Sequence, residues 1–233
     1  MSSLCIITAR GGSKRIPRKN IKNFLGKPII AYSIESALKS KLFKEVMVST
    51  DDDEIANVAK TYGASVPFLR SQKNSDDFST TSDVLVEVIE AYRSIGSEFD
   101  TACCIYPTAP FVTPEKLQEA FSVLREHKYD SLFPIVKFGF PILRSLKMEN
   151  NLVQPNWPEN YLKRSQDLPP AYHDAGQFYC FNVPVFLKNK NMMMERTGAI
   201  IVDENSVQDI DTEDDWKLAE LKYRLLHDHN YQS

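Results

Sequence analysis

The sequence lacks several features that would assign it to a specialised class of protein. No run approaches the ~20 apolar residues of a transmembrane helix. The apolar run Leu4–Ala9 is too short for a secretory signal and leads into basic residues. Positive charge is not in excess, because 28 Lys and Arg against 31 Asp and Glu give a net charge of −3. We therefore expect neither a membrane protein nor a nucleic-acid-binding protein, which favours a basic surface.

Cysteine and histidine motifs are also missing. The four cysteines show no CxxC and no metal spacing, and two of them are adjacent inside an apolar run. We expect reduced, packed thiols in a cytoplasmic protein, which argues against a disulfide scaffold and a zinc module. The four histidines form no metal set, and GxSxG is absent. The residues concerned are Cys5, Cys103, Cys104, Cys180, His127, His173, His227 and His229.

What is present is an alternation of strand-like and helix-like segments. The chain has 233 residues, 42% of them hydrophobic and 25% charged, which suits one large globular domain or one and a half. Short apolar runs alternating with amphipathic segments predict βαβ units and an α/β fold, with a mostly parallel central sheet flanked by helices. The predicted strands are Leu4–Ala9, Glu45–Ser49, Ser65–Leu69, Thr101–Tyr106, Ser131–Val136, Gln177–Asn182 and Ala199–Val202. The predicted helices are Pro28–Lys39, Glu54–Tyr62, Val84–Ile95, Glu115–Glu126 and Thr212–His227.

The pattern changes between Lys137 and His173. This segment holds five prolines and no helical period, and a long segment of this kind inside a compact chain is usually functional. We interpret residues 137–173 as an inserted β-rich protrusion and as the contact of a dimer. Residues 1–136 and 174–233 would then form the α/β domain.

The first candidate site is a basic loop directly after the first predicted strand. Residues Ala9–Asn20 read ARGGSKRIPRKN, with five cationic side chains and two glycines. Ligands of α/β sheets collect at the carboxyl ends of strands, and glycines allow backbone N–H groups to form an anion nest. A polyphosphate is the expected guest, although the loop is neither a Walker A nor a GxGxxG motif. The alternative is a solvated basic turn.

The second candidate is an acidic pair before the last predicted helix. Asp209 and Asp211 are two residues apart, so in an extended segment both carboxylates leave the same side. A hard divalent cation that also contacts phosphate oxygens requires one or two such carboxylates. The alternative is that Asp211 or Thr212 simply caps the helix.

Three further motifs follow predicted strands. Ser49–Asp51 suits a helix cap as well as a site. The turn YPTAP at Tyr106–Pro110 forms either a pocket wall or a sharp exit from the sheet, since its two prolines fix a rigid turn. His173 and Asp174 are adjacent, and because neighbouring strand residues face opposite ways we reject a His–Asp dyad.

Four of these segments together resemble one family. The loop ARGGSKRIPRKN, the turn YPTAP, the segment DAGQFY and the tail DIDTEDD occur in order along the chain. They are similar to the cytidylyltransferases that activate nine-carbon sialic-type sugars, the CMP-sialic acid synthetases. Two features resemble most the members that act on pseudaminic acid. They are Tyr106, where the sialic acid enzymes usually have Gln, and Asp174–Tyr179, where those enzymes tend to have an Asn-Gly pair.

The resemblance implies a fold, a reaction and partners. The fold is of the nucleotide-diphospho-sugar transferase type, Rossmann-like, with a β-rich protrusion exchanged in a homodimer. The implied reaction joins CTP to an acidic nine-carbon sugar, with Mg²⁺, to give the CMP-sugar and pyrophosphate. Other acceptors remain open, namely N-acetylneuraminate, legionaminate and 3-deoxy-manno-octulosonate. A non-catalytic nucleotide-binding domain is the alternative from another class.

The resemblance also implies roles for individual residues. Arg10, Lys19, Asp209 and Asp211 would be catalytic, with the two aspartates as ligands of Mg²⁺. The nucleotide would contact Arg10, Gly11, Gly12, Ser13, Lys19, Asn20, Arg70, Thr80 and Thr81. The sugar would contact Tyr106, Pro107, Thr108, Gln177 and Tyr179. The sequence departs from the family where a basic residue of the protrusion reaches the partner's sugar, because Ser165 stands there and Arg164 lies one place off.

Overall fold

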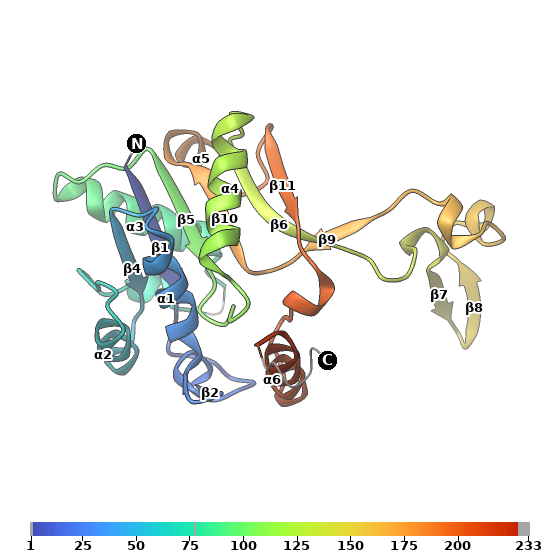
Figure 1. Ribbon diagram of the computed structural model, residues 1–233, viewed down its shortest axis with the longest axis horizontal. Coiled ribbons are helices and arrows are strands. Elements are labelled where there is room, and N and C mark those ends of the chain that lie inside the picture. The colour runs from blue at the N-terminus through green and yellow to red at the C-terminus, as the bar shows by residue number, and fades with distance from the viewer. Residues whose placement is uncertain (1, 77, 228–233) are drawn as a thin grey trace.

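A computed structural model describes residues 2–76 and 78–227. Figure 1 shows a central sheet with helices around it and an arm that extends far to one side. Six strands lie in the order β11–β6–β10–β5–β1–β4, and β9 pairs with β6 outside this path. The strands are β1 Ser3–Thr8, β4 Glu45–Ser49, β5 Thr101–Ile105, β6 Ser131–Lys137, β9 Tyr172–Asp174, β10 Phe178–Asn182 and β11 Thr197–Ile201.

Five of these seven strands run in one direction. β1 pairs in parallel with both β4 and β5, and β11 pairs in parallel with β6. β10 lies antiparallel between β5 and β6, and β9 is antiparallel to β6. The predicted α/β fold with a mostly parallel sheet is therefore confirmed. The reversed β10 places the end of β9 and the start of β10 beside the carboxyl ends of its parallel neighbours.

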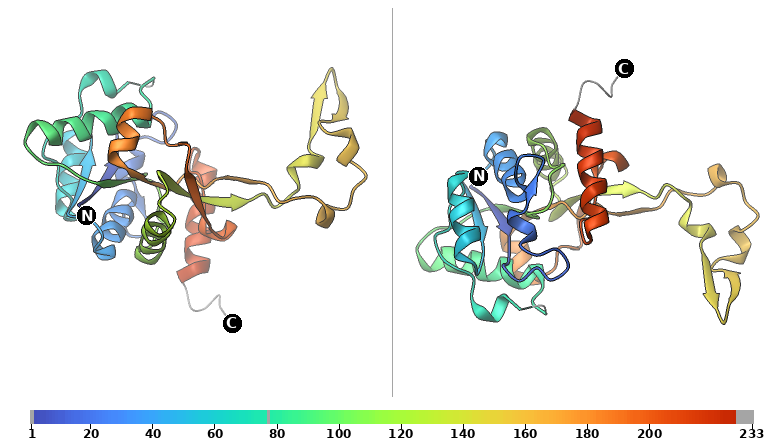
Figure 2. Two further views of the ribbon diagram at one scale, coloured as in Figure 1. Left: turned by 90° about the horizontal axis from the view of Figure 1, so that it is seen from above. Right: turned by 90° about the horizontal axis from the view of Figure 1, so that it is seen from below.

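Helices cover both faces of the sheet, as the two views of Figure 2 show. α1, α2 and α4 pack on one face, and α3 and α5 pack on the other. Cys5 and Ile7 of β1 belong to the first cluster, whereas Leu4 and Ile6 belong to the second. The apolar run is thus continuous because β1 is buried on both sides. The helices are α1 Ile29–Ser40, α2 Asp53–Thr61, α3 Thr81–Ser94, α4 Pro114–Glu126, α5 Val183–Asn189 and α6 Glu213–His227.

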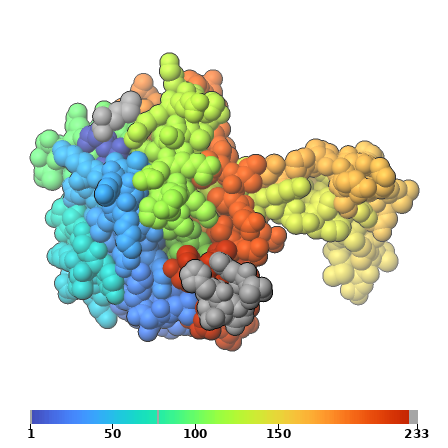
Figure 3. All heavy atoms as spheres, in the orientation of Figure 1, coloured from blue at the N-terminus to red at the C-terminus, as the bar shows by residue number. Residues whose placement is uncertain are grey.

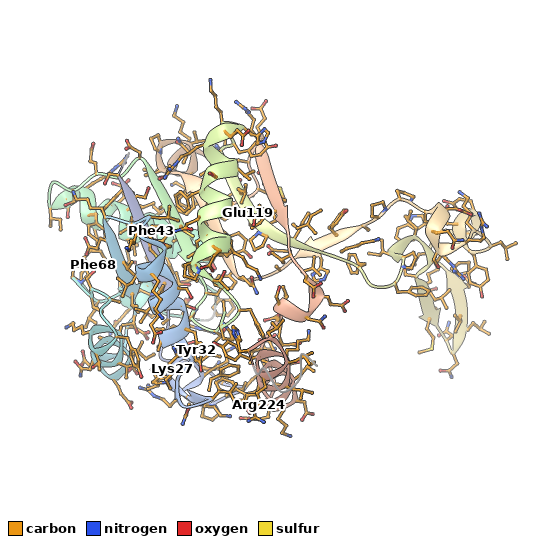
Figure 4. The ribbon with its side chains drawn as sticks, in the orientation of Figure 1. Lys27, Tyr32, Phe43, Phe68, Glu119 and Arg224 are labelled. Carbon is orange, nitrogen blue, oxygen red and sulfur yellow. The ribbon has the colours of Figure 1, made fainter. Side chains whose placement is uncertain are left out.

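A third apolar cluster holds α6 against the start of α1. Trp216 packs edge-on against Phe24, with ring centroids 5.5 Å apart, and Phe24 meets Tyr32 in the same way at 5.4 Å. Lys27 lies 4.0 Å above the ring of Tyr32, and Figure 4 shows both beside α6, which carries Arg224. Phe24 and Lys27 come from a short hairpin, β2 Asn23–Phe24 and β3 Lys27–Pro28. This packing brings the start of α6 close to the loop after β1.

The arm leaves the sheet after β6 and returns through β9. Figure 3 shows it as a separate lobe joined to the body by a narrow neck. It contains an antiparallel hairpin, β7 Leu146–Glu149 and β8 Leu152–Pro155. The remaining regular structure is short: 3-10 helices span Lys19–Ile21, Gln72–Asn74, Ile142–Arg144, Pro158–Asn160, Ser165–Asp167 and Glu204–Ser206.

The predicted strand Ser65–Leu69 is wrong. The segment makes an isolated bridge between Ser65 and Met47 and no strand among the described residues. Pro67 has no N–H to donate to a ladder, so pairing with β4 stops after the bridge. The chain still follows the edge of the sheet, because the Arg70 N–H donates to the Thr50 carbonyl at 2.8 Å.

Two helices also differ from the prediction. α3 begins at Thr81, three residues earlier than expected, because Thr80 and Asp83 form a capping box ahead of the apolar positions. α5 was not predicted, since a helix of seven residues is too short to show a clear period, although Pro184 in its first turn is a start signal.

The prediction for the cysteines is confirmed. All four are buried free thiols, and burial raises the pKa of Cys104 to about 12. The Sγ atoms of Cys103 and Cys180 lie 3.6 Å apart across the β5–β10 pair. Within residues 2–76 and 78–227, no helix is long and apolar enough to cross a membrane.

Candidate active site

The basic loop lines a cavity at the carboxyl end of β1. This cavity, which we call the basic cavity, has a volume of about 410 Å³. Its walls come from the end of β1, the loop after it and the turn after β5. The lining residues are Thr8, Arg10, Ser13, Lys14, Arg15, Lys19, Asn20, Tyr106, Pro107 and Thr108. Four of the five predicted cations therefore share one cavity, and the turn after β5 forms its wall.

The fifth cation, Arg18, has a structural role. Arg18 has a left-handed backbone (φ 55°), and its guanidinium donates to both Asp52 oxygens, at 2.5 and 2.9 Å, and to Glu54. These hydrogen bonds lower the pKa of Asp52 to about 2. Arg18 thus ties the basic loop to the start of α2, where Asp52 also caps the helix by accepting from the Ile55 N–H.

The two glycines occupy different surroundings. The Gly11 N–H donates to Asp51 at 2.9 Å, and a Cβ on Gly11 would lie 2.8 Å from an oxygen of Asp52. Gly11 is therefore required by the close approach of the acidic segment, and its N–H is not part of an open anion nest. Gly12 has open space around it. Neither glycine lines the basic cavity, so its positive charge comes from side chains.

The acidic pair converges on the basic loop. Ile210 is buried, whereas Asp209 is exposed and Asp211 is partly exposed. Arg15 lies 2.8 Å from Asp211, and the Lys19 ammonium lies 3.7 Å from the same oxygen. Charges separated by almost 200 positions in the sequence thus meet at one edge of the cavity.

Lys19 is fixed at this meeting point. Its ammonium donates to the Ile210 carbonyl at 2.6 Å. Burial lowers the pKa of Lys19, although Asp211 and Asp209 both favour its charged form. A second hydrogen bond steadies the loop itself, because the Asn20 amide donates to the Arg10 carbonyl at 2.9 Å.

The start of α6 tests the alternative that Asp211 or Thr212 caps the helix. The Thr212 hydroxyl accepts from the Asp215 N–H, and the Asp215 carboxylate accepts from the N–H groups of Asp211 and Thr212. Thr212 and Asp215 therefore cap α6, and the helix-cap alternative is confirmed for Thr212. The carboxylate of Asp211 is left to face the basic loop.

A second cavity adjoins the basic cavity beside α3. This Arg70 cavity, of about 260 Å³, is lined by Thr8, Arg10, Arg70, Asn74, Asp76, Ser79, Thr80, Thr81, Val84 and Tyr106. The Arg70 guanidinium donates to the hydroxyl and the carbonyl of Ser49, so β4 fixes its direction. The structure thus brings Arg70, Thr80 and Thr81 together with Arg10, as the resemblance implies for the nucleotide.

A third cavity lies on the other side of Tyr106, beside the neck of the arm. This acidic cavity, of about 350 Å³, is lined by Tyr106, Val136, His173, Asp174, Ala175, Gly176, Glu204, Val207, Gln208, Asp209 and Lys222. Tyr106 is the residue that the three cavities share. Its ring packs against Tyr179 with centroids 5.5 Å apart, and burial raises the pKa of Tyr106.

Four of the five predicted sugar contacts do not line the acidic cavity. Pro107 and Thr108 line the basic cavity. Gln177 and Tyr179 are buried behind the acidic cavity: the Gln177 amide donates to the Ser206 carbonyl, and the Tyr179 hydroxyl donates to Asp174. Tyr179 therefore supports the lining residue Asp174, and Gln177 holds Ser206, the neighbour of the lining residue Val207.

Sequence reasoning missed three charged residues that line the acidic cavity, namely Asp174, Glu204 and Lys222. In the sequence Asp174 is conspicuous only as the neighbour of His173, whereas in the structure its carboxylate accepts from the Gly176 N–H and the Tyr179 hydroxyl. Lys222 lies in α6, where a lysine ordinarily indicates a solvated helix face. Its position opposite the loop before α6 depends on tertiary packing, and no sequence signal marks it.

The fold and the cavities define an α/β nucleotidyltransferase, in which a basic cavity at the strand ends faces an acidic pair. Solved structures share this fold. A CMP:2-keto-3-deoxy-manno-octonic acid synthetase complexed with CTP matches with a TM-score of 0.68 and 18% identity, covering 97% of this chain and 99% of that one. A 4-diphosphocytidyl-2C-methyl-D-erythritol synthase from Anaerococcus prevotii matches at 0.65 and 14%, covering 96% and 98%.

The chain belongs to the cytidylyltransferase family, whose model matches residues 4–223. A pseudaminic acid cytidylyltransferase of Campylobacter jejuni is 43% identical over 98% of this chain and 99% of its own length. A CMP-N,N′-diacetyllegionaminic acid synthase of Legionella pneumophila is 35% identical over 97% of each chain. An N-acylneuraminate cytidylyltransferase of Danio rerio is 36% identical over 93% of this chain and 50% of its own length. The resemblance drawn from the sequence motifs is confirmed.

Proposed function

We propose that this enzyme transfers CMP from CTP to the anomeric hydroxyl of a nonulosonic acid, and that the sugar is pseudaminic acid. The observation that carries the proposal is the contact of Lys19 and Arg15 with Asp211, which joins a cationic cavity to an acidic pair at one edge. The names of the C. jejuni and L. pneumophila relatives support the choice of an acidic nine-carbon sugar. The identity to the first of them supports pseudaminic acid.

In this proposal the triphosphate occupies the basic cavity. Arg10, Lys14, Arg15 and Lys19 line it, so their charge would offset the charge that grows on the departing pyrophosphate. The cytidine would lie in the adjoining Arg70 cavity. The protein's main contribution is then to position the sugar hydroxyl in line with the α-phosphorus, because phosphoryl transfer needs little covalent work by side chains.

Asp209 and Asp211 fit a magnesium ion. They flank the buried Ile210 and are themselves accessible, and hard oxygen ligands are those that Mg²⁺ prefers. Mg²⁺ is usually held by one or two carboxylates, with phosphate oxygens and water completing its coordination. When bound, Mg²⁺ would polarise the phosphate and lower the charge repulsion of the attacking oxygen. Arg15 would then exchange Asp211 for the triphosphate.

The acidic cavity would hold the sugar on the far side of Tyr106. The ring of Tyr106 separates this cavity from the basic cavity and lines both. A sugar there would present its anomeric hydroxyl past Tyr106 toward Asp209. Asp174, with fixed hydrogen bonds from Gly176 and Tyr179, offers its carboxylate to the hydroxyl or amide hydrogens of the sugar.

The proposal includes a homodimer formed through the arm. On β7 and β8, Leu146 and Met148 lie opposite Pro155 and Val153, which gives the hairpin one apolar face. Leu146, Met148 and Val153 are each more than half exposed in the single chain. Because an exposed apolar hairpin is marginal alone, a second copy of the arm is the proposed cover. The buried reduced thiols support a cytoplasmic location.

The test is release of pyrophosphate from a panel of nucleotides and sugars, with and without Mg²⁺. We expect release with CTP and pseudaminic acid, with a kcat/KM at least ~10-fold above N-acetylneuraminate, legionaminate or 3-deoxy-manno-octulosonate. A preference for another of these acids would replace the sugar assignment and leave the transfer intact. Nucleotide binding without release for any sugar would show a non-catalytic nucleotide-binding domain instead.

A further inference from the structure

The acidic cavity contains a fixed cation that the reaction described so far does not use. Three carboxylates line this cavity, those of Asp174, Glu204 and Asp209, and Lys222 is the one Lys or Arg side chain among its lining residues. An acidic sugar entering this cavity would meet three negative charges, so its own carboxylate needs a positive partner.

Lys222 is held by neutral groups. Its ammonium donates to the Val207 carbonyl at 2.8 Å and to the Glu204 carbonyl at 3.1 Å. No carboxylate of the described residues lies within salt-bridge distance of it, in contrast to Lys217 on the same helix, which pairs with Asp214 at 3.0 Å. The direction of the Lys222 ammonium is therefore fixed while its charge remains available, and one of its three N–H groups is left for a ligand.

The rest of the site supports this placement. Lys222 lies in α6, the helix that directly follows the segment of Asp209. Its two acceptors, Glu204 and Val207, come just before that segment. Ser206 lies between the two acceptors of Lys222, and its carbonyl is held by Gln177 and its hydroxyl by Lys116, so the segment that fixes Lys222 is itself braced from two other elements. A cation that is already fixed loses little conformational freedom when an anion binds.

We propose that Lys222 binds the carboxylate of the acidic sugar and thereby sets the preference for an acid over a neutral acceptor. This inference rests on the proposed function, since it assigns the sugar to the acidic cavity. A charge-assisted hydrogen bond of this kind is expected to strengthen acid binding about 10- to 100-fold.

The experiment compares pseudaminic acid with its C1 methyl ester as acceptors, for the wild type and for Lys222→Gln and Lys222→Met. Glutamine can still donate hydrogen bonds to backbone carbonyls but carries no charge. Methionine removes both the hydrogen-bond donor and the charge. We expect the wild type to favour the acid over the ester in kcat/KM by at least ~10-fold, and both variants to reduce that ratio to near one, through the KM of the acid. The KM of CTP should stay within about twofold.

The outcomes separate the inference from the function on which it rests. If the acid-to-ester ratio of both variants equals that of the wild type, Lys222 only braces the loop and the inference is overturned. If the wild type turns over neither compound nor any other nonulosonic acid, the proposed function fails. Lys217→Met is the matched control on the same helix, with an unchanged ratio expected. If Lys222→Met does not fold, as judged by circular dichroism, Lys222→Gln carries the test.

Discussion

At the scale of single residues, Asp211 carries the sharpest consequence. Its carboxylate is the acceptor shared by Arg15 and Lys19 and the expected ligand of Mg²⁺. Asp211→Asn should lower kcat by at least ~100-fold, the lower range for losing a positioned electrostatic group. Stability should change by less than ~1 kcal/mol, because the ion pairs are partly exposed. Pyrophosphate release and thermal unfolding measure the two effects.

Asp214→Asn provides the control for Asp211. Asp214 lies in the first turn of α6 and its carboxylate contacts the exposed Lys217. Its replacement should leave kcat within about twofold. An Asp211→Asn enzyme that kept the wild-type rate in Mg²⁺ would remove Asp211 from the metal site.

Lys19 predicts opposite effects of pH on activity and on stability. Burial lowers the pKa of Lys19, so the folded protein loses this proton at a lower pH than the unfolded chain. As pH rises through that window, kcat/KM for CTP should fall because the cation disappears. The free energy of unfolding should rise, because the unfolded chain then binds more protons.

The measurement for Lys19 is a comparison of wild type, Lys19→Arg and Lys19→Met from about pH 7 to about pH 10. Arginine stays charged, so its alkaline limb in kcat/KM for CTP should be absent or shifted upward. Methionine should raise the KM of CTP at every pH and remove the rise in stability that Lys19 contributes. If Lys19→Met changed the KM of the sugar and left that of CTP untouched, the assignment to the triphosphate would be wrong.

Single residues also show where sequence reasoning ends. Placement after β1 was enough to predict that the basic loop forms a site, because strand ends of parallel sheets meet at one edge. Which of its cations face the cavity was not predictable. Arg18 turns away because a left-handed backbone aims it at Asp52 and Glu54, a choice that depends on a helix 34 residues later. Gln177 and Tyr179 likewise became supporting residues once β10 was buried between β5 and β6.

At the scale of elements, β11 depends on one close contact. A Cβ on Gly198 would lie 2.2 Å from the ring of Tyr129, so the glycine allows the ring to lie on the strand. Gly198→Ala should lower the free energy of unfolding by about 1–3 kcal/mol, the usual cost of overpacking. Urea unfolding measures it, and the cost should shrink when Tyr129→Ala is added.

Gly139→Ala is the matched control for Gly198. A Cβ there would meet Glu204 at 3.5 Å, an ordinary contact, and Gly139 has no left-handed backbone. Its replacement should change stability by less than about 0.5 kcal/mol. Equal losses for the two variants would show that Tyr129 adapts and that the contact does not limit β11.

Elements with strong local signals were predictable and elements decided by pairing were not. β1, β4, β5 and β6 appear where apolar runs predicted them, because burial on both faces leaves a continuous pattern. The segment at Ser65 has the same composition, but Pro67 ends its pairing. The direction of β10 leaves no trace in its own residues, since an apolar strand has the same pattern in either direction.

At the scale of the whole molecule, the arm exposes an unusually large number of apolar side chains. Nine of the 19 large hydrophobic side chains that are exposed in the described residues lie between 140 and 172. A monomeric protein rarely leaves such a surface open, and a two-stranded hairpin does not stabilise itself. The composition of residues 137–173 indicated that this segment differs, but its face-to-face pattern became visible only with the register of β7 and β8.

The apolar face of the hairpin therefore predicts the oligomeric state. We expect a dimer in sedimentation equilibrium, and Met148→Lys with Val153→Lys should raise its dissociation constant at least ~100-fold, because two charges would have to be buried without partners. Glu149→Gln with Gln154→Lys adds the same charge on the opposite face of the same strands and should leave the constant within a few-fold. Because both pairs of substitutions change the net charge equally, a difference between them reports the buried face and not long-range repulsion. A wild type that sediments as a monomer, or equal weakening by both variants, would mean that the arm has another role.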